Sequence, residues 1–538
     1  MIPLLFLSLA APFITALLLM LFRSSLNQQS ARLLALGGSL ATLVLAAILS
    51  SQYYSGAVRP LESSGTPLTS SADETSAIRP KVEFRQPWLS LGGDAEHPEV
   101  KFEMYFGLDG ISVAMIALTA LLTVSSVLIS WESISDRASE FYASVMILEA
   151  GLIGVFCAFD IILFYVFFEM TLIPLFFMIA IWGGPDRRRA AIKFFLYTLA
   201  GSLITLSGLI GLMVYTSGEG LATPSSLPAL SSWIAAHPIE KSLQVTLFLA
   251  MSAGFLVKVP VFPFHTWLPL AHVEAPTAGS VLLAGVLLKL GSYGFLRMCL
   301  PMFPEACVDI GLPVIGLLSV IGIIYGSLCA LAQRDIKKLV AYSSVAHLGF
   351  CMVGLFALNT EGLTGSVLQM INHGLSTGAL FLIVGMVYER YHTRMLDDIG
   401  GLAQRLPLIA VCMVFIAMSS IGLPGLNGFV GEFLSLAGMF RQDPLYAALA
   451  TTGVVLGAWY LLTAVQHAFF GKLREPHGHH GDHDTITDLK PREFVALAPL
   501  VILCLWIGIR PATLIDLIEP DVKAVADIYT KTTDAGAQ

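Results

Sequence analysis

Six proton-titratable side chains lie inside long apolar segments of the sequence. They are Glu169, Lys258, Lys289, His347, His373 and Glu432. A charged side chain at the centre of a membrane-spanning helix costs about 2.5–3.5 kcal/mol on insertion scales, so such residues are functional candidates. Glutamate, lysine and histidine can each bind and release a proton, and the six side chains come from six different segments. The pattern therefore indicates a relay that passes protons through a membrane.

A buried ion pair is predicted between Glu169, in "FYVFFEMTLIPLFF", and Lys258, in "LVKVPVFPF". Opposite charges roughly 4 Å apart gain about 4 kcal/mol at an effective dielectric constant of about 20. That energy corresponds to about a thousandfold change in the proton affinity of the lysine. The lysine would hold its proton while it is paired and release it when the glutamate moves away. The alternative is a static pair that only fixes helix packing.

The other four residues have structural alternatives of the same kind. Lys289 and Glu432 could form static buried contacts. His347 and His373 could be core histidines whose ring nitrogens are satisfied by neighbouring groups. The relay and the structural interpretation both remain open at this point.

Other residues with reactive side chains are not assigned to the relay. Glu149 and Asp160 are expected near helix ends, from which a charge can reach the interface. The run "HGHHGDHD", residues 477–484, has metal-ligand residue types, but its glycines and its place in a loop favour a solvated segment without a metal. The seven cysteines show no C-x-x-C spacing, so neither an iron–sulfur cluster nor a disulfide framework is predicted.

Membrane-spanning helices are the elements that must position these residues. Charged residues make up only 13% of the chain, against about 25% in a soluble domain, and the mean hydropathy is +0.77. The net charge of −8 comes without a basic block, which excludes a nucleic-acid partner. We predict an all-α integral membrane protein with about 14 spans. They are residues 3–22, 31–50, 110–130, 142–159, 161–182, 190–216, 243–264, 277–299, 308–331, 336–357, 364–388, 406–434, 444–470 and 492–511.

Loop charges predict the orientation of these spans. Most basic loop residues follow odd-numbered spans, whereas only Lys241, Arg297 and Arg441 are assigned to the short loops after even-numbered spans. The positive-inside rule then places both termini on the outer side, here of a bacterial inner membrane. Residues 53–106 form an outer polar insertion, within which "KVEFRQPWLSL" and "EVKFEMYFGLDG" predict a β-hairpin, with a plain loop as the alternative. The tail "ATLIDLIEPDVKAVADIY" predicts a short amphipathic helix.

Two spans are interrupted by proline and glycine beside a charged residue. They are helix 7, with "VKVPVFPF", and helix 12, with "GLPGLNGFVGE". Broken helices at corresponding positions of two halves point to an ion site, and an offset of five spans predicts inverted repeats of helices 4–8 and 9–13. The predicted division is 1–52 (helices 1 and 2), 53–106 (insertion), 107–141 (helix 3 and its loop), 142–299 (first repeat), 300–470 (second repeat), 471–491 (His-rich loop) and 492–538 (helix 14 and tail).

Three long motifs resemble the antiporter-like subunits of respiratory complex I, the proton-pumping NADH:quinone oxidoreductase. They are "LVKVPVFPFHTWLPLAHVEAPTAGSVLLAGVLLKLGSYG", "FEMTLIPLFFMIAIWGG" and "RDIKKLVAYSSVAHLGF". The resemblance implies that Glu169 and Lys258 form a coupling pair and that Lys289, His347 and His373 form a central relay. It also implies that Glu432 releases the proton outward. Members of this family bind no cofactor themselves, because NADH, FMN, iron–sulfur clusters and quinone belong to partner subunits.

The residue on helix 12 distinguishes members of the family. Glu432 matches the M type, called subunit 4 in mitochondria, whereas L-type and N-type members carry lysine there. The resemblance thus implies L-type and N-type neighbours in the membrane arm. Two other transporters remain alternatives, a Mrp-type cation/proton antiporter subunit and a membrane-bound hydrogenase-type pump subunit. A structural scaffold, in which the buried charges only fix packing, is a third.

Overall fold

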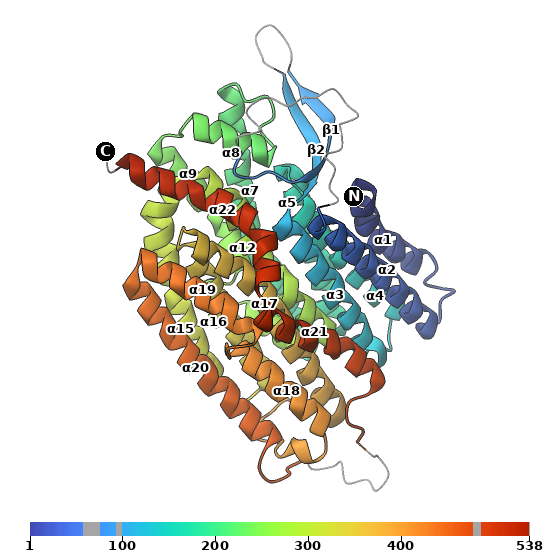
Figure 1. Cartoon of the computed structure of the whole chain (residues 1–538). Coiled ribbons are helices and arrows are strands. Elements are labelled where there is room, and N and C mark those ends of the chain that lie inside the picture. Colours follow the sequence, from blue (N-terminus) through green and yellow to red (C-terminus); the bar gives the residue numbers. More distant parts are fainter. Residues whose placement is uncertain (57–75, 93–98, 477–485, 537–538) are drawn as a thin grey trace.

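The computed structural model describes residues 1–56, 76–92, 99–476 and 486–536. It is a bundle of helices with a two-stranded hairpin projecting from one end (Figure 1). The first half contains α1 (Ile2–Leu21), α2 (Gln28–Tyr54), α3 (Gly110–Ser133), α4 (Ala138–Cys157), α5 (Ile161–Met170), α6 (Leu172–Trp182), α7 (Arg187–Gly218), α8 (Leu227–Ala236), α9 (Lys241–Lys258), α10 (Leu268–Glu274), α11 (Thr277–Leu282), α12 (Lys289–Gly294), α13 (Leu300–Met302) and α14 (Pro304–Ala306). The second half contains α15 (Leu317–Leu331), α16 (Ile336–Leu355), α17 (Thr360–Tyr391), α18 (Pro407–Ser420), α19 (Asn427–Gln442), α20 (Pro444–Phe469), α21 (Pro491–Ile509) and α22 (Ala512–Gly536). Short π-helical segments occupy Leu283–Leu287, Phe295–Cys299 and Cys307–Gly316, and a 3₁₀ turn occupies Leu402–Gln404.

Twelve helical stretches in the described part of the chain are long and apolar enough to cross a membrane. The two predicted spans that are not among them are 243–264 and 406–434, which are the two that the sequence predicts to be broken. The helical membrane fold is therefore confirmed. The total of 14 spans and the inverted repeats remain predictions.

Both predicted interruptions are present in the structure. The chain leaves α9 at Lys258, turns through 259–267 and resumes as α10. The indole N–H of Trp267 donates to the Val257 carbonyl at 3.0 Å and so satisfies one acceptor near this break. In the second interruption Gly422 and Gly425 have φ of +77° and +92°, a backbone region that glycine enters without steric cost.

Acidic side chains begin several of the spans. Asp109 accepts a hydrogen bond from Ser112 N–H at 2.8 Å, ahead of α3. Asp160 accepts from Ile162 N–H at 2.8 Å, ahead of α5. Asp335 accepts from Lys337 N–H at 2.8 Å, ahead of α16. Each carboxylate satisfies backbone donors that a helix start leaves without an intrahelical partner.

The predicted hairpin is confirmed as β1 (Val82–Leu91) and β2 (Val100–Leu108). The strands pair antiparallel from Val82 opposite Leu108 to Leu91 opposite Val100, with an irregularity between Pro87 and Leu89. The predicted C-terminal helix is also present, as α22. Most of the Ser/Thr/Pro-rich stretch, residues 57–75, and the His-rich run at 477–484 lie outside the described residues.

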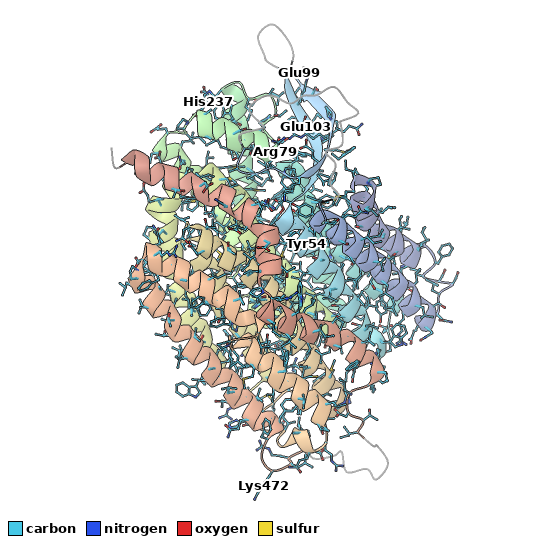
Figure 2. The ribbon with its side chains drawn as sticks, viewed as in Figure 1. Tyr54, Arg79, Glu99, Glu103, His237 and Lys472 are labelled. Atoms are coloured by element: carbon cyan, nitrogen blue, oxygen red, sulfur yellow. The ribbon has the colours of Figure 1, made fainter. Side chains whose placement is uncertain are left out.

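The two ends of the bundle differ in chemistry. We call the end that carries β1 and β2 the hairpin side, and the opposite end, with Lys472 and most of the basic loop residues, the basic side (Figure 2). Both chain termini lie on the hairpin side (Figure 1). There Phe6 of α1 packs edge-to-face on Phe84 of β1, with ring centroids 5.0 Å apart. The stretches Thr277–Met302 and Thr360–Tyr391 run through the middle of the bundle, and the most apolar 18-residue window of each is wholly buried.

Two expectations about charged residues were wrong. Arg297 is not a loop residue, because it lies in the buried π-helical segment before α13 and pairs with Asp109 at 2.5 Å. Glu149 does not reach the interface, because it lies within α4 and is 0% exposed. Asp160 does begin a helix, but it too is buried. The apolar sequence around each residue showed that it belonged to a span, but not which face of the helix carried it.

Candidate functional site

Lys289 and His373 form the first contact of a polar line inside the bundle. Lys289 begins α12 after the π-helical segment, and its ammonium nitrogen lies 2.7 Å from His373 Nδ1. The ammonium also donates to the Ala284 carbonyl. Lys289 is 0% exposed and His373, on α17, is 2% exposed, so the contact is shielded from solvent and lipid. At this distance, a proton can pass directly between the two nitrogens.

His347 and Glu432 form the second contact. His347 Nδ1, on α16, lies 2.8 Å from Glu432 Oε1, on α19, and both residues are buried. The other ring nitrogen of His347 lies 3.2 Å from the Tyr460 hydroxyl. Gln369 Nε2 donates to the same glutamate oxygen at 3.2 Å. Both ends of the pair are thus held by neutral hydrogen-bonding groups.

The two contacts lie next to each other. The rings of His373 and His347 have centroids 5.9 Å apart. Lys289, His373, His347 and Glu432 therefore follow one another in space, although they come from α12, α17, α16 and α19. We call these four residues the central line. Four of the six residues predicted from the sequence are brought together in it.

The predicted pair of Glu169 and Lys258 is not in contact. Among the described residues no ion pair within 4.0 Å includes either side chain, and the Lys258 ammonium is buried without a hydrogen bond. It lies 4.1 Å from the centroid of the Phe168 ring, so a cation–π contact replaces the expected one. Phe168 also packs edge-to-face on Phe255 of α9 at 6.0 Å, which holds α5 against α9.

Several polar residues around the central line were missed by sequence analysis. Tyr460 and Gln369 contact His347 and Glu432, and Asn372 Nδ2 donates to the Asn427 carbonyl at 2.7 Å, beside the break before α19. All are polar side chains inside otherwise apolar spans. A polar side chain inside an apolar span is visible in the sequence, but the sequence does not show that it contacts the central line.

A second buried ionic group lies on the hairpin side, where Arg297 meets Asp109. Asp521 of α22 approaches the same point and accepts from Gly110 N–H at 2.8 Å. Burial, and then repulsion from Asp109, raises the pKa of the Asp521 carboxyl to about 7. The half-buried Asp521 carboxyl group thereby connects α22 to the start of α3.

The described residues contain no group of three His, Cys, Asp or Glu side chains that could hold a metal ion. Their cysteines are all free thiols. What the central line offers chemically is therefore amine, imidazole and carboxyl groups in hydrogen-bonding range. Such groups exchange protons.

Comparisons with known proteins identify the family of the chain. A family model described as "NADH:quinone oxidoreductase/Mrp antiporter, TM" matches residues 158–457. NADH-quinone oxidoreductase subunit M of Rhodobacter capsulatus is 45% identical over 430 residues, which are 79% of this chain and 82% of that protein. NADH-ubiquinone oxidoreductase chain 4 of Chondrus crispus is 44% identical over 413 residues, covering 76% and 81%.

The fold is also similar to that of a solved membrane complex. A chain in the structure of respiratory complex I from Thermus thermophilus with bound NADH has a TM-score of 0.81 and 30% sequence identity. The alignment covers 98% of this chain and 99% of that one. The chain therefore belongs to the subunit M (chain 4) family of antiporter-like membrane subunits of NADH:quinone oxidoreductase.

Proposed function

We propose that this chain translocates protons across the membrane as a membrane-arm subunit of NADH:quinone oxidoreductase. Electron transfer from NADH to quinone in other subunits drives it. The observation that carries the proposal is the central line, with 2.7 Å between Lys289 and His373 and 2.8 Å between His347 and Glu432. The centroids of the two histidine rings are 5.9 Å apart, and in this proposal a water molecule carries the proton between them. Glu432, beside the break before α19, is the outward end of the line.

Glu169 and Lys258 have the coupling role in this proposal. Lys258 is the last residue of α9, at the break, where small backbone changes move its ammonium group. Its position over Phe168 rather than against Glu169 is the geometry expected of the separated pair. A contact between the pair would favour the protonated lysine, and separation would favour proton release toward Lys289.

The wider assignments follow from the same family. The chain itself holds no redox cofactor, and NADH, FMN, iron–sulfur clusters and quinone are bound by partner subunits. L-type and N-type antiporter-like subunits are its neighbours. The basic side faces the cytoplasm of a bacterial cell, across the inner membrane, so both termini are on the outer side.

Two transport alternatives and one structural alternative make different predictions. A Mrp-type antiporter subunit would exchange a cation for protons without NADH, and a hydrogenase-type subunit would be driven by another redox arm. A scaffold would need its buried charges only for assembly. Purification of the complex with its redox subunits distinguishes the proposal from the two transport alternatives. Of the three complexes, only NADH:quinone oxidoreductase would contain subunits that oxidise NADH.

Proton pumping by the assembled complex in vesicles tests the proposal. Lys258→Ala, Glu169→Gln and Lys289→Ala each remove one titratable group, and Lys241→Ala is the control, because Lys241 is an exposed lysine on the hairpin side paired with Asp309. Loss of a positioned proton-transfer group slows transfer by about 10²–10⁴-fold. We expect fewer protons pumped per NADH oxidised in the first three variants and no change in the control. Intact assembly with unchanged pumping in all three would refute the proposal and favour the scaffold.

A further inference from the structure

The helix α10 (Leu268–Glu274) is the second half of the broken helix that begins with α9. One end of α10 follows the break beside Lys258, and the other end leads through Ala275 and Pro276 into α11. The last carbonyl groups of a helix have no partner within the helix, so groups from elsewhere satisfy them. The partners of these carbonyl groups therefore show which parts of the bundle hold the end of α10.

Each of the five carbonyl groups of residues 271–275 has a partner. The first accepts from the N–H of Ala275, in the same segment. The other four accept from other elements: His272 from the Ser280 hydroxyl at 3.0 Å, Val273 from Lys337 at 3.3 Å and Arg394 at 2.7 Å, Glu274 from Gly184 N–H at 2.9 Å, and Ala275 from Lys337 at 2.6 Å. We call residues 273–275, together with Lys337, Arg394 and Gly184, the junction.

Two cations of the junction join α10 to the start of α16. Lys337 is the second residue of α16 and is 7% exposed. Arg394 lies in the loop after α17, and its guanidinium is 3.4 Å from the carboxylate of Asp335, which caps α16. The backbone of this loop is also bound to α16, because the Arg394 carbonyl accepts from Ile336 N–H at 3.0 Å. Positive charge at the C-terminal end of a helix is favourable, and charged donors form the stronger hydrogen bonds.

The carboxylate of Glu274 joins the junction to the connection between α6 and α7. Glu274 Oε2 accepts from Asp186 N–H at 2.9 Å. A Cβ atom on Gly184 would lie 2.7 Å from the same oxygen, so glycine permits this close approach. α6 continues directly from α5, the helix that carries Glu169. The junction is thus connected to the segment of each member of the coupling pair.

The sides of α10 are held as well as its end. The ring of His272 stacks on Phe381 of α17, with centroids 4.7 Å apart, and α10 packs along α16 and α7. At its other end the helix meets the break, where the chain turns through residues 259–267. α10 is therefore attached to the interior of the bundle everywhere except at the break.

The segments that meet at the junction carry five of the six titratable residues predicted from the sequence. Glu169 lies on α5, Lys258 ends α9, Lys289 lies on α12, His347 on α16 and His373 on α17. Lys337 and His347 are ten residues apart on one continuous helix, which is about 15 Å. Rigid helices pass a displacement at one end to residues further along. A displacement of α10 would therefore reach the central line through α16.

We propose that Lys337 and Arg394 are positioning residues of the transport reaction. They hold the end of α10 on the start of α16, so that a change at the break beside Lys258 displaces α16 and with it His347. The displacement changes the separation between the rings of His347 and His373, which is the widest step of the central line. The inference rests on the proposed function and explains how the coupling pair acts on the central line. In this role neither Lys337 nor Arg394 takes up or releases a proton.

The measurement that separates positioning from simple stabilisation is the number of protons pumped per NADH oxidised by the assembled complex in vesicles. A purely stabilising contact changes how much complex assembles, which NADH oxidation with an artificial electron acceptor measures, but it leaves this ratio unchanged. A positioning contact changes the ratio, because electron transfer continues in other subunits while the central line is no longer engaged.

Lys337→Met removes the donors of the side chain and keeps most of its length and apolar packing. We expect it to lower the ratio as far as Lys258→Ala does, because either substitution stops the signal that reaches His347. Lys337→Arg keeps a cation that can donate to both carbonyl groups, so it should restore most of the loss. Lys338→Met is the matched control, because Lys338 is the next residue of α16 and is exposed.

Arg394→Met is the second variant, and it decides the matter if Lys337→Met does not assemble. Arg394 is partly exposed, and its replacement leaves Lys337 bound to the end of α10. It should lower the ratio in the same direction.

A wild-type ratio in the deciding variant, together with a lowered ratio in Lys258→Ala, would overturn the role of the junction and leave the proposed function standing. Equal loss in Lys337→Met and Lys337→Arg would also overturn it, because the donated hydrogen bonds would then not matter. Wild-type ratios in Lys258→Ala and Lys289→Ala as well would overturn both proposals.

Discussion

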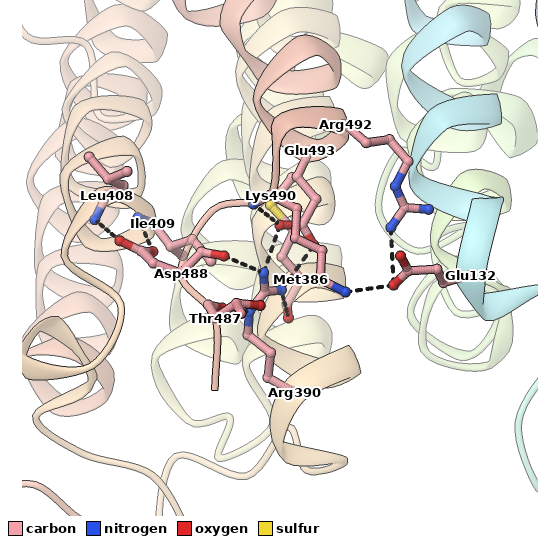
Figure 3. A network of polar contacts seen from close by, with 10 residues as sticks. All are labelled: Glu132, Met386, Arg390, Leu408, Ile409, Thr487, Asp488, Lys490, Arg492 and Glu493. Carbon is pink, nitrogen blue, oxygen red and sulfur yellow. Dashed lines mark hydrogen bonds and ion pairs between the residues drawn. The ribbon is translucent and has the colours of Figure 1, made fainter. Parts of the chain in front are cut away.

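Removal of one partner from the Arg390–Glu493 pair should destabilise the basic side locally. The two side chains are 7% and 0% exposed, and they are joined by two hydrogen bonds. After Arg390→Ala the Glu493 carboxylate stays buried, and the backbone N–H of Lys490 is its remaining hydrogen-bond donor (Figure 3). The substitution also removes the hydrogen bonds that Arg390 donates to the carbonyls of Met386, Thr487 and Asp488. Loss of one partner of a buried pair costs about 3–5 kcal/mol. We therefore expect either single alanine variant to lower the free energy of local unfolding by about 3–5 kcal/mol.

Hydrogen–deuterium exchange in the assembled complex measures this local cost. A change of 3 kcal/mol corresponds to roughly 150-fold faster exchange, since each 1.4 kcal/mol is about tenfold. This faster exchange should appear at the backbone amides of residues 486–495 and of the C-terminal end of α17. The double variant should cost about 1–3 kcal/mol less than the sum of the singles, because neither partner is then left uncompensated. Glu361→Ala, which breaks an exposed pair with Arg441, should change exchange by about fivefold or less.

Less than threefold faster exchange in both single variants would refute this reasoning. So would additive effects in the double variant. Either result would mean that the pair is hydrated or replaceable. Arg390 and Glu493 would then not form a rigid buried pair.

Two further perturbations test other contacts. The raised pKa of Asp521 means that the folded protein binds a proton at this carboxyl group more tightly than the unfolded chain does. The contribution of Asp521 to the docking of α22 is therefore full below about pH 4 and is lost as the pH rises toward about 7. Hydrogen–deuterium exchange of residues 512–530, corrected for intrinsic rates, should be faster at pH 8 than at pH 5.5, and this difference should disappear in Asp521→Asn. A methyl group at Gly385 would lie 2.5 Å from Thr277 Cγ2, so Gly385→Ala should weaken the packing of α17 on α11 by about 1–3 kcal/mol, and Thr277→Ala in the same chain should restore it. Equal hydrogen–deuterium exchange of the α11 amides in Gly385→Ala and wild type would contradict this.

The breaks in the helices could be predicted from the sequence because proline and glycine act through the backbone. Pro260 and Pro263 remove donors wherever they occur, and Gly422 and Gly425 adopt φ values that other residues avoid. The hairpin and α22 were predictable for a similar reason, since alternation and amphipathic spacing are local properties. The identity of the titratable residues in the spans was also evident from the sequence.

Contacts between distant segments could not be predicted. No local pattern shows that the Lys258 ammonium lies over the Phe168 ring, or that Arg297 turns inward to Asp109. Those contacts depend on helix rotation and on side-chain conformation, which apolar spacing alone does not determine. A cavity of about 710 Å³ that is lined by Glu132, Lys337 and Glu389 likewise depends on segments that are far apart in the sequence.

The most direct test of the central line is replacement of His373, which links Lys289 at 2.7 Å to the His347 ring at 5.9 Å. His373→Phe has nearly the same shape but no ring nitrogen, and His237→Phe is the control, because His237 is exposed on the hairpin side (Figure 2). The measurement is protons pumped per NADH oxidised by the assembled complex in vesicles. We expect a marked fall for His373→Phe with full assembly and no fall for His237→Phe. Wild-type pumping by His373→Phe would contradict the account, because no proton would then pass through the central line.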